Sequence, residues 1–127
     1  MPVRIKSNKD DPKFPDGISV SLNNARKSKV IKELLAEGPE ALDLMEGNGF
    51  ITIGDFPYSA ILLLFDYISN YGDQSFKPGM IKQWEIEYFQ ETPINIFIAF
   101  SVLASYLEVD IAINFVKVYT HPLLEIL

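Results

Sequence analysis

The sequence predicts a single α+β domain over residues 1–127, with a small, mainly antiparallel three-stranded sheet flanked by about five helices. Hydrophobic residues make up 48% of the chain and charged residues 22%, a globular composition that can form one core. Short segments with alternating apolar and polar residues come first, as in half-buried strands. Longer segments with helical spacing follow, two of them after a proline, a residue favoured where helices begin.

Two strands are predicted near the N-terminus. Val3 and Ile5 alternate with basic residues, and Ile18, Val20 and Leu22 alternate with serines. The stretch between them is rich in proline, glycine and aspartate, which favours a loop. The two segments therefore predict an antiparallel pair with one apolar face.

A short helix, a long loop and a third strand are predicted next. Ser28 is placed to cap an amphipathic helix that ends near Gly38. Residues 38–49 are acidic and bounded by glycines, which predicts a loop with at most a turn of helix. Residues 50–53 form the third predicted strand.

Two further segments follow the third strand. Pro57 is predicted at the first position of a helix that continues over residues 58–71 and has one broad apolar face. Trp84, Ile86 and Tyr88 then alternate with polar residues, which predicts a strand-like or extended segment.

The last two predicted elements are helices. Thr92 is a candidate N-cap with Pro93 at the first helical position, and the helix is apolar on nearly every side through Leu107. Such a helix lies inside a fold or beneath a partner. Asp110 is placed to cap a last helix that ends at Pro122.

Residues suited to catalysis are sparse. The chain has no cysteine and one histidine, His121, which is more readily explained as a surface residue than as a catalytic base. Glu85 and Glu87 are predicted on a charged, solvated face, which does not favour a tuned acid–base pair. No phosphate-binding loop or metalloprotease motif occurs. We therefore expect no enzyme activity, no metal and no cofactor.

The charge distribution is uneven. Residues 1–32 contain eight basic and three acidic residues, a net charge of +5, whereas residues 33–127 contain three basic and fourteen acidic residues, a net charge of −11. The only basic cluster contains no aromatic residue that would stack on bases, and it comprises Arg26, Lys27, Lys29 and Lys32. A solvated helix start and a docking site for an acidic partner both explain this cluster better than nucleic-acid binding does.

No membrane span or secretory signal is predicted. The longest uncharged stretch has 16 residues, from Thr92 to Leu107, whereas a membrane-spanning helix needs about 20. The basic N-terminal residues are not followed by an apolar segment. An intracellular protein is therefore expected.

Three segments carry a family resemblance when they are read in order. They are KVIKELL at residues 29–35, ITIGDFP at residues 51–57 and ASYLE at residues 104–108. Together with the order of predicted elements, they resemble the BTB/POZ fold, particularly elongin C and its F-box-binding adaptor relatives. The resemblance covers residues 18–109, and residues 110–127 form an additional C-terminal helix.

The resemblance implies an adaptor that links a substrate receptor to a cullin in a ubiquitin ligase, in the nucleus and cytoplasm. Its partners would be a cullin, the BC-box helix of a receptor and an elongin B-like protein. The pocket for a receptor leucine would be built from Tyr67, Phe89, Phe100, Ala104, Tyr106 and Val109. The cullin-facing surface would include Pro39, Leu42, Met45 and Asn95.

Other functions remain open at this point. Phe100 and Ala104 suit the domain's own core as well as they suit a pocket, whereas Tyr67 and Tyr106 favour the pocket. Filling of the recess by Ile111 or Phe115 would remove the pocket. BTB domains also act as homodimerisation modules, and an F-box-binding type of adaptor without the terminal helices is a further alternative. A small-molecule-binding domain would use the cavity beside Tyr67 and Phe100.

Overall fold

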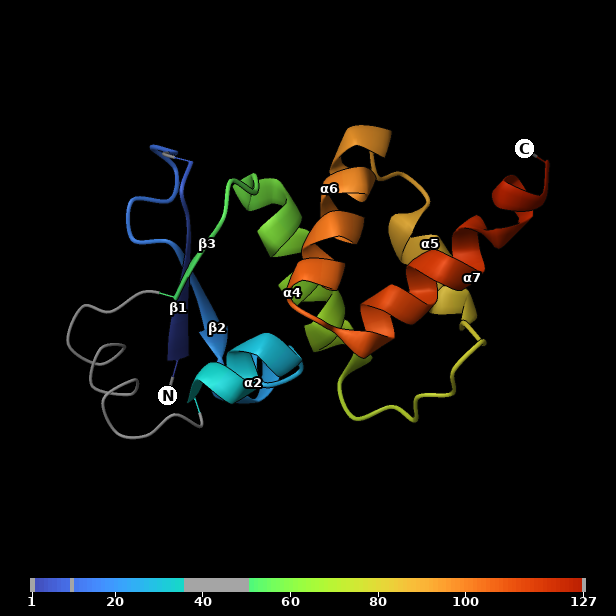
Figure 1. Cartoon of the computed structure of the whole chain (residues 1–127), viewed down its shortest axis with the longest axis horizontal. Helices are drawn as coiled ribbons and strands as arrows, with labels where there is room; N and C mark the ends of the chain where they lie inside the picture. The colour runs from blue at the N-terminus through green and yellow to red at the C-terminus, as the bar shows by residue number, and fades with distance from the viewer. Residues whose placement is uncertain (1, 10, 36–50, 127) are drawn as a thin grey trace.

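The computed structural model describes residues 2–9, 11–35 and 51–126, and within these ranges the chain forms an α+β fold (Figure 1). The strands are β1 (Pro2–Ser7), β2 (Ile18–Ser21) and β3 (Ile51–Ile53). The six helices are α1 (Leu22–Ala25), α2 (Lys29–Leu35), α4 (Tyr58–Tyr71), α5 (Gln83–Phe89), α6 (Ile94–Tyr106) and α7 (Asp110–Ile126). No helix in these ranges is both long and apolar enough to cross a membrane.

The sheet is mixed rather than mainly antiparallel. β1 lies in the centre, antiparallel to β2 with Val3 opposite Val20, and parallel to β3 with Ile5 opposite Ile51. A parallel neighbour needs a long crossover connection, and the chain between β2 and β3 provides one. Strand alternation predicted which residues face the core, but it could not give the direction of β3.

Two serines position the helices that follow the sheet. Ser21 accepts a hydrogen bond from the Asn24 amide and caps α1, a helix that the sequence did not predict. Ser28 caps α2 as predicted, because its Oγ accepts from the Ile31 amide at 3.1 Å. The same hydroxyl donates to the Leu107 carbonyl at 2.5 Å, so the start of α2 is tied to the end of α6.

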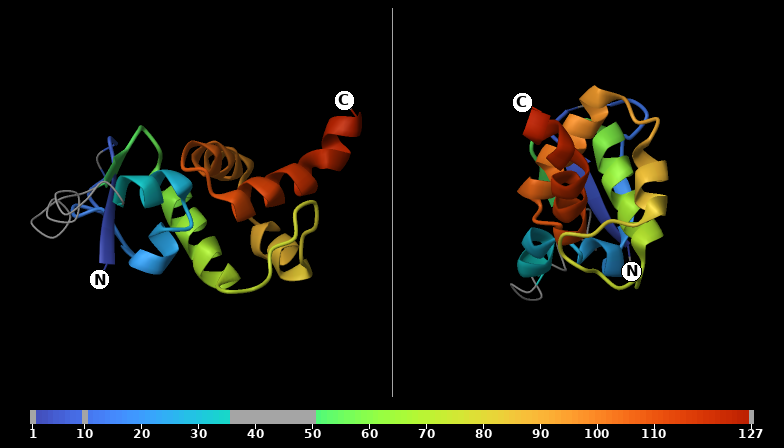
Figure 2. Two further views of the ribbon diagram at one scale, coloured as in Figure 1. Left: turned by 60° about the horizontal axis from the view of Figure 1, so that its bottom comes forward. Right: turned by 90° about the vertical axis from the view of Figure 1, so that its right-hand side faces the viewer.

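Helices α4 and α6 pack against each other, and each follows a proline. Pro57 and Pro93 occupy the N-cap positions instead of the first helical positions, so each helix begins one residue later than predicted, and Pro93 takes the N-cap place expected for Thr92. The sheet lies at one end of the molecule and the far end of α7 at the other (Figure 1 and the left view of Figure 2). Helices α4 and α6 therefore form the middle of the fold.

The predicted strand around Trp84 is a helix. Helix α5 begins after Lys82, whose amide donates to Glu85 Oε2 at 2.7 Å. This contact is one half of a capping box, a helix signal that outweighs the short alternation of apolar residues. Glu85 is only 2% exposed, so its expected place on a solvated face is also wrong.

Glu108 forms the turn between α6 and α7. It has a positive φ of 53°, and the amide of the next residue, Val109, donates to the Ala104 carbonyl at 3.0 Å. This arrangement is the hydrogen-bonded turn with which many helices end. Helix α7 then continues beyond Pro122, where the sequence predicted its end, to Ile126.

Candidate protein-binding surface

Five of the six residues assigned to the receptor pocket are buried in the core. Their exposed fractions are 3% for Phe89 and 0% for Tyr67, Phe100, Ala104 and Val109. The remaining residue, Tyr106, is 52% exposed, and its ring lies 5.5 Å from that of Phe56 instead of facing the others. The structure therefore brings five of the predicted residues together and leaves the sixth on the surface.

Phe115 of α7 fills the recess between these residues. Its ring stacks on Phe89 at 4.6 Å between centroids and lies 6.1 Å from Tyr67. Phe115 itself is 0% exposed. We call Tyr67, Phe89, Phe100 and Phe115 the aromatic cluster. Contrary to the expectation of an open pocket, this cluster is closed by the protein's own helix.

Hydrogen bonds hold the aromatic cluster in place. The Tyr67 hydroxyl donates to Glu85 Oε1 at 2.5 Å and lies 3.2 Å from the Ile111 carbonyl oxygen. Burial, reinforced by the hydrogen bond to Glu85, raises the pKa of Tyr67 above its usual value. This polar contact joins α4, α5 and α7, so the closed arrangement is specified by more than apolar packing.

One face of α6 has the opposite character. Large apolar side chains recur there every four residues, and their exposed fractions are 73% for Ile94, 56% for Ile98, 55% for Val102 and 52% for Tyr106. We call these four residues the α6 face. Residues four apart lie above one another on a helix, so the stripe is continuous over about 18 Å. Large apolar residues gathered in this way mark sites where proteins interact.

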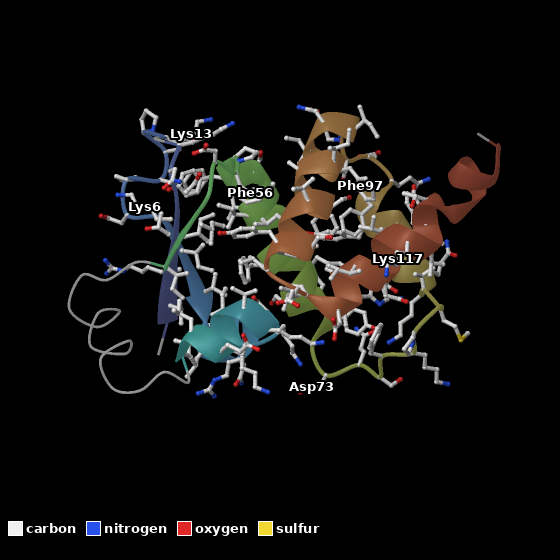
Figure 3. All side chains as sticks on the ribbon, viewed as in Figure 1. Lys6, Lys13, Phe56, Asp73, Phe97 and Lys117 are labelled. Atoms are coloured by element: carbon white, nitrogen blue, oxygen red, sulfur yellow. The ribbon has the colours of Figure 1, made fainter. Side chains whose placement is uncertain are left out.

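A groove adjoins the α6 face. It has a volume of about 460 Å³ and lies where α6, α7 and the end of α5 meet. Its lining residues are Phe89, Gln90, Thr92, Ile94, Phe97, Ile98, Ser101, Val102, Tyr119 and Thr120. Figure 3 labels Phe97, one of these lining residues, beside α6 on the side of α7. None of the lining residues is charged, so the groove suits an apolar side chain.

The cullin-facing residues divide between two parts of the chain. Asn95 is exposed at the start of α6, beside Ile94. Pro39, Leu42 and Met45 lie outside the described residues. The part of the predicted surface that the structure describes therefore adjoins the α6 face.

Candidate catalytic residues do not gather at this surface. No group of three or more histidine, cysteine, aspartate or glutamate residues that could hold a metal occurs within the described ranges. The side chain of His121 is not among those described. The residues that meet at the surface are suited to apolar contact.

The α6 face was missed from the sequence because the helix is apolar on every side. Its four members are spaced four residues apart, but the buried Phe100 and Ala104 share the same spacing. Periodicity alone could not tell which stripe faces outward. Serines and asparagine at positions 95, 101 and 105 were the available signal, because they cluster on one side of the helix.

No protein-family model matches this chain, and no curated protein matches it.

Proposed function

We propose that this protein is an elongin C-like adaptor that links a substrate receptor to a cullin scaffold in a ubiquitin ligase. The alternative subtype is an F-box-binding adaptor. In either subtype the α6 face docks a helix of a partner protein, because apolar residues repeated every four positions match one side of such a helix. The exposed Ile94, Ile98 and Val102 are the observation that carries the proposal.

The chemistry of α6 supports docking of a helix. The 13 residues of this helix include no charged side chain. An apolar partner would therefore cover the stripe without burying an unpaired charge, which is the costly part of many contacts. The adjoining groove offers space for an anchor side chain, and such anchors supply much of the binding energy at interfaces.

The receptor contact has to differ from the one implied by the resemblance. A leucine cannot enter the aromatic cluster while Phe115 lies against Phe89. The groove between α6 and α7 is an apolar space that remains open, and it is bordered by Ile94 and Tyr119. We therefore assign the anchor of a partner helix to this groove.

The test is capture of a cullin N-terminal domain and of a BC-box peptide by the purified protein. Ile98→Asp places a charge in the middle of the α6 face and should weaken capture of a helix that docks there at least tenfold. Leu62→Asp is the matched control, because Leu62 is also an exposed apolar residue, at 42%, but lies on α4. Equal capture by both variants and the wild type would remove the assignment to α6.

A homodimerisation module is the second candidate. The uncharged α6 face favours it as well, because two copies of the same stripe can meet without like charges opposing each other. Light scattering on the isolated protein separates the two functions. A dimer that Ile98→Asp dissociates, together with no cullin capture, would favour self-association.

A further inference from the structure

A polar pocket lies on a different part of the molecule from the α6 groove. It has a volume of about 500 Å³ and is formed where the turn after α1 faces the end of α4. Its lining residues are Ser21, Asn23, Asn24, Arg26, Lys27, Gly72 and Asp73. The two sites have no lining residue in common. In Figure 3, Asp73 lies at the lower edge of the molecule, away from Phe97.

Backbone hydrogen bonds fix the turn that carries Arg26 and Lys27, which we call the basic turn. The Arg26 amide donates to the Leu22 carbonyl at 3.0 Å, and the Lys27 amide donates to the Asn24 carbonyl at 3.1 Å. The residues on either side, Ala25 and Ser28, are 0% exposed. The backbone of the basic turn is therefore held in place before any ligand arrives, which lowers the ordering cost of binding.

The positive charges of the basic turn are available to bind a negatively charged ligand. Among the described residues, Lys29 pairs with Asp110 at 3.1 Å, whereas the side chains of Arg26 and Lys27 have no ion-pair partner. Both are exposed. They stand out in a protein whose net charge is −6. A negatively charged segment is opposed by the net charge of the protein and is attracted to exposed basic side chains such as these.

We propose that the basic turn binds an acidic peptide segment of a partner protein. The Arg26 guanidinium can donate two parallel hydrogen bonds to one carboxylate, and Lys27 supplies a second positive charge beside it. The amides of Asn23 and Asn24 can bond to the peptide backbone. Asp73 on the opposite side repels a carboxylate, so acidic side chains are directed toward Arg26 and Lys27.

A peptide fits this pocket better than a nucleic acid does. The lining contains no aromatic side chain on which a base could stack. Asp73 and the net charge of −6 both oppose a polyphosphate backbone. This second surface does not depend on the proposed function, because it shares no residue with the α6 face.

The test is fluorescence anisotropy with a labelled 12-residue peptide rich in glutamate. Its controls are the same peptide with glutamine in place of glutamate, and a labelled thymidine oligonucleotide. Arg26→Gln with Lys27→Gln should weaken binding of the acidic peptide about fivefold and reduce its salt dependence. Lys77→Gln with Lys117→Gln removes the same charge from exposed sites elsewhere and should leave the affinity unchanged. Asp73→Asn should strengthen binding about twofold.

Four results would overturn the proposal. Equal loss in both double variants would mean that net charge alone attracts the peptide. Equal binding of the glutamine peptide, or tighter binding of the oligonucleotide, would mean that carboxylates are not what the basic turn recognises. Absence of binding by the acidic peptide at low salt would also remove the site. Thermal unfolding of each variant establishes that it is folded when it is assayed.

Discussion

Helix α6 contributes Phe100 to the aromatic cluster on one side and carries the α6 face on the other, and the two sides differ in what covers them. On one side of the helix, Phe100 and Ala104 are 0% exposed beneath α4 and α7. On the other side, Ile94 and Ile98 are 73% and 56% exposed. The residue types on the two sides are similar, so composition does not explain the difference in exposure. The path of the chain after Val109 explains it, because that path packs α7 over Phe100 and Ala104 and leaves the α6 face uncovered.

This contrast separates stability from recognition. Each side chain of the aromatic cluster is surrounded by other side chains, so its removal leaves a cavity. The α6 face has solvent on its outer side, so truncation there leaves the folded protein almost unchanged. Variants in the two regions should therefore have different effects, and the following three are ordered from the largest expected effect to the smallest.

Phe115→Ala should have the largest effect on stability. It removes a fully buried ring that contacts Phe89 and Tyr67, so we expect the free energy of unfolding to fall by about 3–5 kcal/mol. Urea denaturation followed by the fluorescence of Trp84 measures this change. A loss below about 1 kcal/mol would mean that α7 does not close the cluster in solution.

Tyr67→Phe should have an intermediate effect. It leaves Glu85 Oε1 without the hydroxyl that donates to it, in a side chain that is 2% exposed, and this should cost about 1–3 kcal/mol. Tyr106→Phe is the matched control, because Tyr106 is 52% exposed, and it should change stability by less than about 0.5 kcal/mol. Tyr67→Ala, by contrast, would remove a core ring and would not separate binding from folding.

The pH dependence of Tyr67→Phe provides a second readout. Burial and the hydrogen bond to Glu85 raise the pKa of Tyr67 in the folded state above the ordinary value of 10.0. The contribution of the Tyr67 hydroxyl to the free energy of unfolding is therefore fully present below about pH 10 and is lost as the pH rises further. The stability difference between wild type and variant should shrink above pH 10. A constant difference up to pH 11 would contradict this contact.

Ile98→Ala should have the smallest effect on stability. Because this side chain is 56% exposed, we expect a change of about 0.5 kcal/mol or less. Leu103→Ala on the same helix is the contrasting variant, since Leu103 is 0% exposed and its truncation should cost about 2–5 kcal/mol. Similar losses from both variants, measured by urea denaturation, would mean that the α6 face is also buried in the protein as it exists in solution.

Local signals in the sequence predicted much of the fold. Serine at position 28 and the prolines at positions 57 and 93 mark helix starts to within one residue, because capping and backbone restriction act over a few residues. Helix α5 was missed because seven residues fit both periodicities, and because lysine is not a capping residue type, so the contact between the Lys82 amide and Glu85 could not be read from the sequence.

The candidate site could be predicted from the sequence less well than the fold. Ile111, Phe115 and Tyr119 are spaced four residues apart, as on one face of a helix, but nothing local says which surface that face covers. The direction of β3 and the filling of the recess both depend on long-range packing. For the same reason, the resemblance could bring Tyr67 and Phe100 together without revealing that α7 lies between them and a partner.

Methyl-group NMR in the presence of a soluble paramagnetic agent tests the division between the two sides of α6 most directly. We predict strong attenuation of the Ile94, Ile98 and Val102 methyl signals, little attenuation at Leu103 and Val109, and recovery of the first set when a BC-box peptide is added. Strong attenuation at Leu103 and Val109, or no protection of the α6 face by the peptide, would contradict this division.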